Sequence, residues 1–247
     1  MIGWAILGGV LGAVGGSFSA TYALRTLDGR QAVLGGSVCD GCSRPLGFEQ
    51  TVPVLSYLVL GGRCQACGGA ISKVHLLGEW AGMAAGAASL VLLPPIQGLL
   101  ALTLTLVMLA SAIIDHHSQR LPDRATLVIA GLAAVLGALA GRLIAGLVAA
   151  VLVAALLLAV RALFQRRKGD PGLGLGDVKL LAALALWLGA ATPWAVVIAA
   201  GIGLAVHRHQ RPEDGRIAFG PAIGISAVVV GLAVDQTVFP GFPGALL

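Results

Sequence analysis

Charge is scarce in this chain. Only 11% of its 247 residues are Asp, Glu, Lys or Arg and 5% are aromatic, whereas 57% are hydrophobic and the mean hydropathy is +0.93. Soluble domains carry about 25% charged residues. The shortage extends along most of the length, so it excludes a water-soluble globular domain and indicates a protein that crosses the lipid bilayer several times.

Basic stripes studded with aromatic residues are also absent, which argues against a nucleic-acid partner despite a net charge of +5 and a pI of about 9.4. The basic residues instead lie beside apolar runs, as charges that flank membrane helices do. The 36 glycines favour close contact between such helices.

The lengths of the apolar runs predict an all-α polytopic membrane protein with about eight transmembrane helices. Crossing a bilayer core of about 30 Å takes roughly 20 apolar residues. We expect helices near 2–24, 76–94, 97–115, 124–140, 143–164, 178–190, 193–206 and 218–238. The sixth and seventh are short, and a single helix broken at Pro193 would leave seven spans instead.

Lys and Arg are distributed unevenly between the two sides of this bundle. The segments on one side are 25–75, 116–123, 165–177 and 207–217. With helix-end residues assigned to the nearer side, fifteen of the sixteen Lys and Arg fall there and only Arg142 falls opposite, so this side is expected to be cytoplasmic. The eight-span order also brings Asp115 and Asp177 to the same membrane face.

All four cysteines fall in the segment before the second predicted helix, as two C-x-x-C pairs: Cys39, Cys42, Cys64 and Cys67. Such pairs present four thiolates to one tetrahedral zinc ion, and a site with four protein ligands is structural because no position stays open for water. Two disulfides or ordinary buried thiols are the alternatives. A cytoplasmic location disfavours disulfides.

Two acids lie at the ends of predicted membrane helices, where charged side chains are costly and usually functional. Asp177 follows a glycine-rich turn, and Asp115 ends an apolar run. Helix capping is the simpler explanation for Asp177, but a carboxylate at a helix C-terminus opposes the helix dipole, so capping explains Asp115 poorly. Gly174 and Gly176 would let a peptide backbone approach closely, and they join Lys179 as candidates for substrate binding or support.

Two close carboxylates cannot both ionise, so one keeps a proton while the other stays charged. The charged one would take a proton from a water that attacks a peptide carbonyl, and the protonated one would support the carbonyl oxygen. Asp123 is expected to cap the fourth helix. Glu79, near the start of the second helix, is expected to face a partner or the site, and most other acids lie in polar loops.

Several motifs resemble those of the bacterial type IV prepilin peptidases, which are GxGD-type aspartic proteases, over nearly the whole length. The similar motifs are Gly16-Ser17-Phe18, Cys39-x-x-Cys42, Val52-Pro53-Val54-Leu55-Ser56-Tyr57, Gly61-Gly62-Arg63-Cys64-x-x-Cys67, Ile71-Ser72, Glu79, Ile114-Asp115, Leu121-Pro122-Asp123, Gly174-Leu175-Gly176-Asp177-Val178-Lys179 and Phe219-Gly220-Pro221.

The resemblance implies cleavage of the basic leader of prepilins or pseudopilins after a glycine, at the cytoplasmic face of the bacterial inner membrane, with Asp115 and Asp177 as the catalytic residues. It also implies methylation of the new N-terminus with S-adenosylmethionine, through the zinc-bearing loop. The chain then divides into a first helix (1–24), a cytoplasmic zinc-binding domain (25–75) and a transmembrane protease core (76–247).

The chain departs from the family pattern in its loop. Thr51-Val52-Pro53 stands where Asn-Ile-Pro is frequent, and Val74-His75-Leu76 where Arg-Tyr-Pro is frequent. These departures lie in the loop and not at the acids. They therefore bear on the methylation that the resemblance implies, and they leave the protease interpretation intact. Two alternatives stay open: a non-catalytic membrane scaffold whose zinc loop docks a pilus or secretion component, and an ion carrier, which lacks an acid in mid-span to complete a path.

Overall fold

The structure, a computed structural model, describes the whole chain except residues 32, 34–35, 170–171, 211–217 and 239–247. Arg211 and Arg216, which were counted on the cytoplasmic side, lie outside the described residues. The long helices are α1 (Ile2–Leu27), α3 (Lys73–Leu92), α4 (Pro95–Ser118), α5 (Asp123–Leu139), α6 (Leu143–Lys168), α7 (Leu175–Leu188), α8 (Thr192–Gln210) and α9 (Gly220–Val238).

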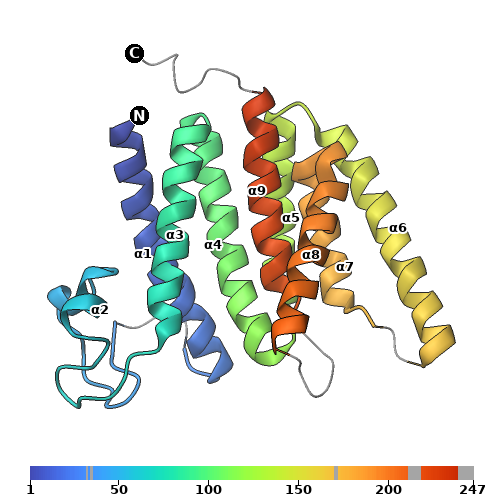
Figure 1. Cartoon of the computed structure of the whole chain (residues 1–247). Helices are drawn as coiled ribbons and strands as arrows, with labels where there is room; N and C mark the ends of the chain where they lie inside the picture. The colour runs from blue at the N-terminus through green and yellow to red at the C-terminus, as the bar shows by residue number, and fades with distance from the viewer. Residues whose placement is uncertain (32, 34–35, 170–171, 211–217, 239–247) are drawn as a thin grey trace.

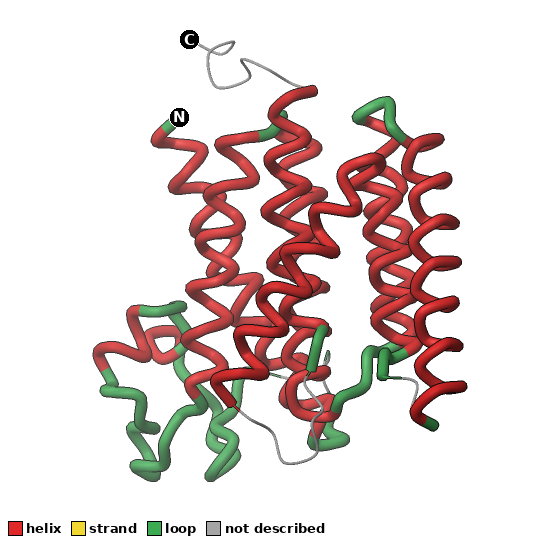
Figure 2. Tube along the Cα trace, turned by 45° about the vertical axis from the view of Figure 1, so that its right-hand side comes forward, coloured by secondary structure: helices red, strands yellow, loops and turns green. Residues whose placement is uncertain are grey.

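These eight helices occupy the eight predicted places, so the predicted all-α fold is confirmed (Figure 2). Three short elements complete the described part of the chain: a 3-10 turn η1 (Phe48–Gln50), helix α2 (Leu55–Val59) and a 3-10 turn η2 (Gly189–Ala191). Helix α6 runs four residues beyond its predicted end because Gln, Arg and Lys are good helix formers outside the apolar run. Helix α7 starts three residues early, with Gly174 as its N-cap.

Four stretches are long and apolar enough to span a membrane by length and composition alone. They are α1, α4, residues Leu143–Arg167 of α6, and the run Leu175–His209. The last run covers both α7 and α8, but it is not one helix. Gly189 has a positive φ of 55°, and α7 and α8 run in opposite directions from this turn (Figure 1). Pro193 lies in the first turn of α8, where proline is tolerated, and is not the break.

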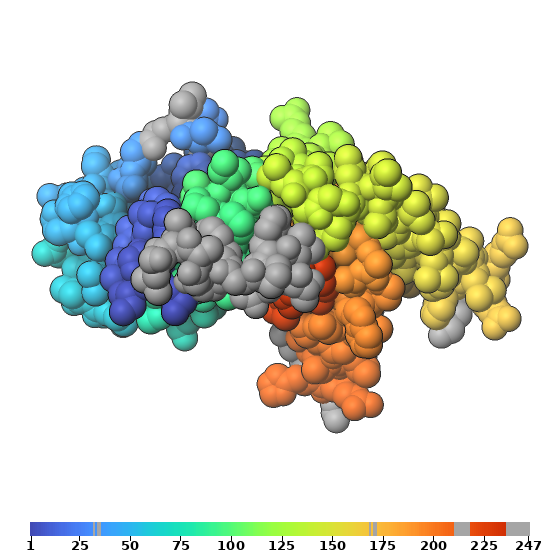
Figure 3. All heavy atoms as spheres, turned by 90° about the horizontal axis from the view of Figure 1, so that it is seen from above, coloured from blue at the N-terminus to red at the C-terminus, as the bar shows by residue number. Residues whose placement is uncertain are grey.

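The ends of the helices alternate as the charge pattern predicts. Helix α1 begins and α9 ends at one end of the bundle, whereas the cysteine loop, the end of α4 and the start of α7 lie at the other (Figure 1). Viewed from above, the molecule is elongated, with the cysteine loop at one extreme, α6 at the other and α8 projecting sideways (Figure 3). Asp115 and Asp177 therefore lie at the same end of the bundle.

Helices α1 and α3 pack backbone to backbone along matched glycines. Gly8, Gly12 and Gly16 of α1 face Gly86, Gly82 and Gly78 of α3, in that order. A Cβ built on Gly12 would lie 1.9 Å from the carbonyl oxygen of Gly82, which no side chain can occupy. The glycine spacing seen in the sequence thus serves close helix contact.

Helix α7 lies at the centre of the other half of the bundle, between α5, α6 and α9. Its Leu184 and Trp187 are fully buried, as is Ile223 of α9. By contrast, α6 leaves Val151, Leu152 and much of its length exposed, as a lipid-facing helix would. The candidate site is therefore built on buried helices whose positions are fixed by packing.

We expect Gly12→Ala to lower the stability of the detergent-solubilised protein by about 1–3 kcal/mol or more, because its methyl group overlaps the α3 backbone. Gly131→Ala, on α5, is the matched control, since nothing lies within 4 Å of its added Cβ. Thermal unfolding of both variants tests the contact. Equal stability of the two variants would show that α1 and α3 do not pack through these glycines.

Candidate functional site

Asp115 lies in the last turn of α4, and only 5% of its surface is exposed. Its Oδ2 accepts a hydrogen bond of 2.8 Å from the backbone N–H of Gly220, the first residue of α9. The carboxylate that opposes the dipole of its own helix thus satisfies the free N–H, and the positive end, of another. Gln119 adopts a left-handed conformation directly after the helix and ends α4.

Asp177 lies in the first turn of α7, three residues after the N-cap Gly174. Its carboxylate accepts a hydrogen bond from the backbone N–H of Gly174, as an acid at this helical position does in a capping box. Asp177 thus caps α7, as the simpler explanation predicted, and this hydrogen bond uses one lone pair of its carboxylate. It does not by itself exclude a second role.

Two contacts hold the start of α7 against the turn between α4 and α5. The Leu121 side chain lies 3.1 Å from the position of a Cβ built on Gly176, so this glycine makes room for the chain's own leucine. The Lys179 ammonium forms an ion pair of 2.7 Å with Asp123, which lies at the first position of α5 and makes no side-chain capping bond. Both contacts therefore hold the first turn of α7, which carries Asp177, beside the turn that follows α4.

The two carboxylates repel one another electrostatically, whereas His116 and Asp115 attract one another. They come from α4 and α7, with the start of α9 beside Asp115. Two acids sharing one region can hold one proton between them, which is the arrangement of aspartic proteases. The site can therefore perform general acid–base chemistry on a water molecule.

The four cysteines meet in the loop between α1 and α3. Their Sγ atoms all lie within 4.8 Å of one another, and those of Cys39 and Cys67 are 3.9 Å apart. All four are described, and all four are free thiols. A zinc ion with Zn–S distances of about 2.3 Å brings tetrahedral sulfurs to about this separation. The cluster is therefore able to bind a metal ion such as zinc.

Each cysteine pair is presented by the same tight turn. The backbone N–H of Ser43 bonds to Cys39 O and that of Gly68 to Cys64 O, both at 2.8 Å. Backbone N–H groups of Cys67 and Ala66 lower the pKa of Cys64 to about 6. The N–H of Gly69 lowers the pKa of Cys67, but the thiols of Cys64 and Cys42 outweigh it and raise that pKa to about 11. Four such crowded thiols can all ionise only around a cation, which supports the fit of a metal.

Glu79 of α3 contacts the cysteine loop and α1, and not the aspartates. Only 6% exposed, it accepts hydrogen bonds of 2.7 Å from the Ser17 hydroxyl of α1 and from the backbone N–H of Val54. Val54 has a positive φ of 66°, so this bond holds a strained turn. Glu79 also lines a cavity of about 360 Å³ between α1, α3 and the loop.

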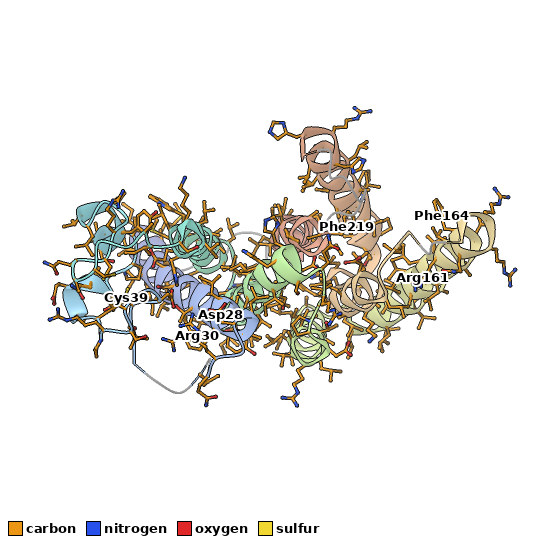
Figure 4. All side chains as sticks on the ribbon, turned by 90° about the horizontal axis from the view of Figure 1, so that it is seen from below. Asp28, Arg30, Cys39, Arg161, Phe164 and Phe219 are labelled. Atoms are coloured by element: carbon orange, nitrogen blue, oxygen red, sulfur yellow. The ribbon has the colours of Figure 1, made fainter. Side chains whose placement is uncertain are left out.

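This cavity has polar walls, with Arg25, Tyr57, His75 and Glu79 among its lining residues. It also reaches Cys39 and Cys64, and its wall includes Thr51 and Pro53. Thr51 and His75 are positions where the chain departs from the pattern it resembles. The cavity and the aspartates are far apart: Cys39 and Phe219, the residue before α9, lie on different parts of the same face (Figure 4).

Sequence reasoning missed two contacts of this site. The N–H of Gly220 partners Asp115, and the Phe219-Gly220-Pro221 motif was the signal, although it was given no role. The carbonyl oxygen of Leu173, just before the start of α7, accepts a hydrogen bond from Arg161 of α6, which lies beside Phe164 on that helix (Figure 4). No pattern in the sequence pairs these two residues.

The fold and the site define a multi-pass membrane protein that carries a buried aspartate, a half-buried aspartate and a four-cysteine loop on one face. Comparison with known proteins identifies the family of the chain. Residues 10–93 match the bacterial peptidase A24 N-terminal domain, and residues 102–207 match the type IV leader peptidase family. The chain belongs to the type IV leader peptidase family, which confirms the resemblance.

Three curated relatives are each called prepilin leader peptidase/N-methyltransferase. The chain is 36% identical to that of Burkholderia pseudomallei (85% of this chain, 69% of the relative) and 33% identical to that of Aeromonas salmonicida (81% and 72%). It is 32% identical to that of Neisseria gonorrhoeae (81% and 72%). No solved structure matches the chain.

We expect Asp115→Leu to lower stability by about 1–3 kcal/mol, because it leaves the buried N–H of Gly220 unpaired. Asp115→Asn keeps an oxygen acceptor and should unfold close to the wild-type temperature. Asp123→Leu is the control, because its ion pair with Lys179 is exposed and contributes about 1 kcal/mol or less. Unfolding in detergent measures all three, and an Asp115→Leu variant as stable as the wild type would contradict the contact.

Proposed function

We propose that this chain cleaves the basic leader of prepilins or pseudopilins after a glycine, at the cytoplasmic face of the bacterial inner membrane, with Asp115 and Asp177 as its catalytic residues. The observation that carries the proposal is that these two acids, 62 positions apart, lie at one end of the bundle and interact electrostatically. The family of the chain and the gathering of basic residues on this side support the reaction and the orientation.

Each carboxylate keeps lone pairs that can accept a hydrogen bond from a water molecule. One oxygen of Asp115 is held by Gly220 and the Asp177 carboxylate is anchored by Gly174, so the remaining lone pairs can address a water molecule. The charged carboxylate removes a proton from that water as its oxygen attacks the scissile carbonyl. The protonated carboxyl donates to the carbonyl oxygen, and the proton taken from water then passes to the leaving amine as the C–N bond breaks.

Asp115→Asn and Asp177→Asn should each lower leader cleavage at least about 100-fold, because an amide can neither accept nor deliver the proton. Asp123→Asn is the matched control at the same face and should keep near wild-type activity. The assay incubates detergent-purified protein with a prepilin and follows leader loss by mass spectrometry.

Full cleavage by either active-site variant would reject the aspartates as the catalytic pair. A wild-type protein that folds but never processes the prepilin would instead favour the scaffold alternative.

We further propose that the cysteine loop holds one structural zinc ion through Cys39, Cys42, Cys64 and Cys67, and that the adjoining cavity takes S-adenosylmethionine. Zinc with four thiolate ligands contributes fold stability to a loop with little core of its own. The cavity volume lies within the range of small-molecule sites. S-adenosylmethionine supplies an electrophilic methyl group, and the buried Glu79 carboxylate attracts and orients the cationic groups that meet there.

Glu79→Gln should lower methylation of the new N-terminus, and binding of S-adenosylmethionine by calorimetry, at least about 10-fold while leader cleavage continues. The expected reason is loss of a buried charge within the cavity, far from the aspartates. Glu49→Gln is the control, because this acid belongs to the same loop and does not line the cavity. Equal methyl-donor binding by Glu79→Gln and the wild type would reject the assignment of the cavity.

A further inference from the structure

Asp235 of α9 is a buried acid at the end of the bundle opposite Asp115 and Asp177. Only 1% of it is exposed. It accepts a hydrogen bond of 2.8 Å from the Trp187 indole N–H of α7, and it forms an ion pair with Arg142, on the turn between α5 and α6. The sequence analysis assigned it no role, whereas in the structure its two partners come from the end of α7 and from the turn before α6.

These three residues, which we call the distal cluster, are not explained by stability alone. A buried ion pair often contributes no more than well-packed apolar side chains would, because both charges lose their hydration. Arg142 is moreover incompletely satisfied: among the described residues, its Nε and Nη1 atoms are buried without a hydrogen-bond partner. The hydrogen bond and the ion pair of the distal cluster fix the position of the end of α7 relative to the end of α9.

Of the two helices that the distal cluster joins, α7 carries Asp177 and α9 donates the backbone hydrogen bond that Asp115 accepts. Helix α7 carries Asp177 about 15 Å from Trp187, and the first residue of α9 binds Asp115 about 22 Å from Asp235, at 1.5 Å per residue. Between these ends the helices pack tightly, because a Cβ on Gly231 would lie 2.3 Å from the Trp187 ring. A shift of α9 along α7 at the distal end therefore reaches Gly220 and the Asp115 carboxylate.

We propose that the distal cluster is a positioning group that sets the separation of the Asp115 and Asp177 carboxylates from the far end of α7 and α9. This inference rests on the proposed protease function. Arg142, Trp187 and Asp235 touch neither substrate nor water in the site, so their effect on cleavage is exerted through the two helices.

The pH profile of kcat separates positioning from simple loss of folded protein. In a coupled pair of acids, the two limbs of the profile report ionisations that belong to the pair, and their spacing depends on the distance between the carboxylates. Fewer folded molecules would lower the rate by the same factor at every pH. His116 acts electrostatically on Asp115 and is unchanged in all the variants below, and Arg142 and Asp235 are the charged groups of the distal cluster.

The experiment compares three variants with the wild type in the prepilin cleavage assay. Asp235→Asn removes the charge that faces Arg142, and Trp187→Phe removes the indole N–H together with part of the ring. A triple variant, Asp235→Leu with Arg142→Met and Trp187→Phe, replaces the whole distal cluster with apolar groups and should recover the stability that Asp235→Asn loses. Ser226→Ala is the control, because within the described residues the hydroxyl of this buried serine of α9 bonds only to the carbonyl oxygen of Ile223 on its own helix.

We expect Asp235→Asn to lower kcat about 10- to 100-fold with little change in KM, since small misplacements of catalytic groups cost this much. Trp187→Phe should lower kcat less, and both should change the spacing of the two pH limbs. The triple variant should keep the altered spacing even where its unfolding temperature returns to the wild-type value, and Ser226→Ala should behave as the wild type.

Two results would overturn the proposal. One is a triple variant, or Trp187→Phe alone if the triple variant does not fold, with the wild-type kcat and pH profile. The other is a rate that falls equally at all pH values in step with the folded fraction. Absence of cleavage by the wild-type protein would instead refute the proposed function, so the two failures are distinguishable.

Discussion

The bond between the Asp115 carboxylate and the backbone N–H of Gly220 is the contact on which the site depends. It is buried, it joins residues 105 positions apart, and it resolves two problems at once. An acid at the C-terminus of α4 and a free N–H at the start of α9 would each be costly alone in a water-poor region. Paired, they fix α9 across the end of α4, and α7 packs against α9 with Asp177 in its first turn.

The molecule is built in two parts on either side of α4. Helices α1 and α3 join through glycine backbones and carry the cysteine loop with its cavity, whereas α5, α6 and α9 pack around α7, which carries Asp177. Helix α4 contacts α1 and α3 on one side and α5 and α9 on the other. The two family matches divide the chain near the start of this helix. Under the proposed function, leader cleavage and methyl transfer would take place at separate positions on one face.

Much of this arrangement can be predicted from the sequence, because it depends on lengths and spacings along the chain. Apolar length locates the helices, alternation of direction puts Asp115 and Asp177 at one end, and cysteine spacing indicates the metal cluster. Pairings between helices are not legible in this way. Nothing in the sequence shows that Gly176 accommodates Leu121, that Glu79 binds Val54, or that Asp235 meets Trp187. Each contact depends on which faces of the helices pack together, and a single sequence does not reveal those pairings.

Whether the two aspartates act as one unit is tested most directly by a double-mutant cycle on the cleavage rate. When two residues share one proton and one water molecule, replacing either one abolishes their joint contribution to the rate. Replacing the second residue then lowers the cleavage rate little further. We predict that Asp115→Asn combined with Asp177→Asn leaves the same residual rate as either single variant. Effects that multiply in the double variant would mean that the carboxylates work independently, and the shared site described here would be wrong.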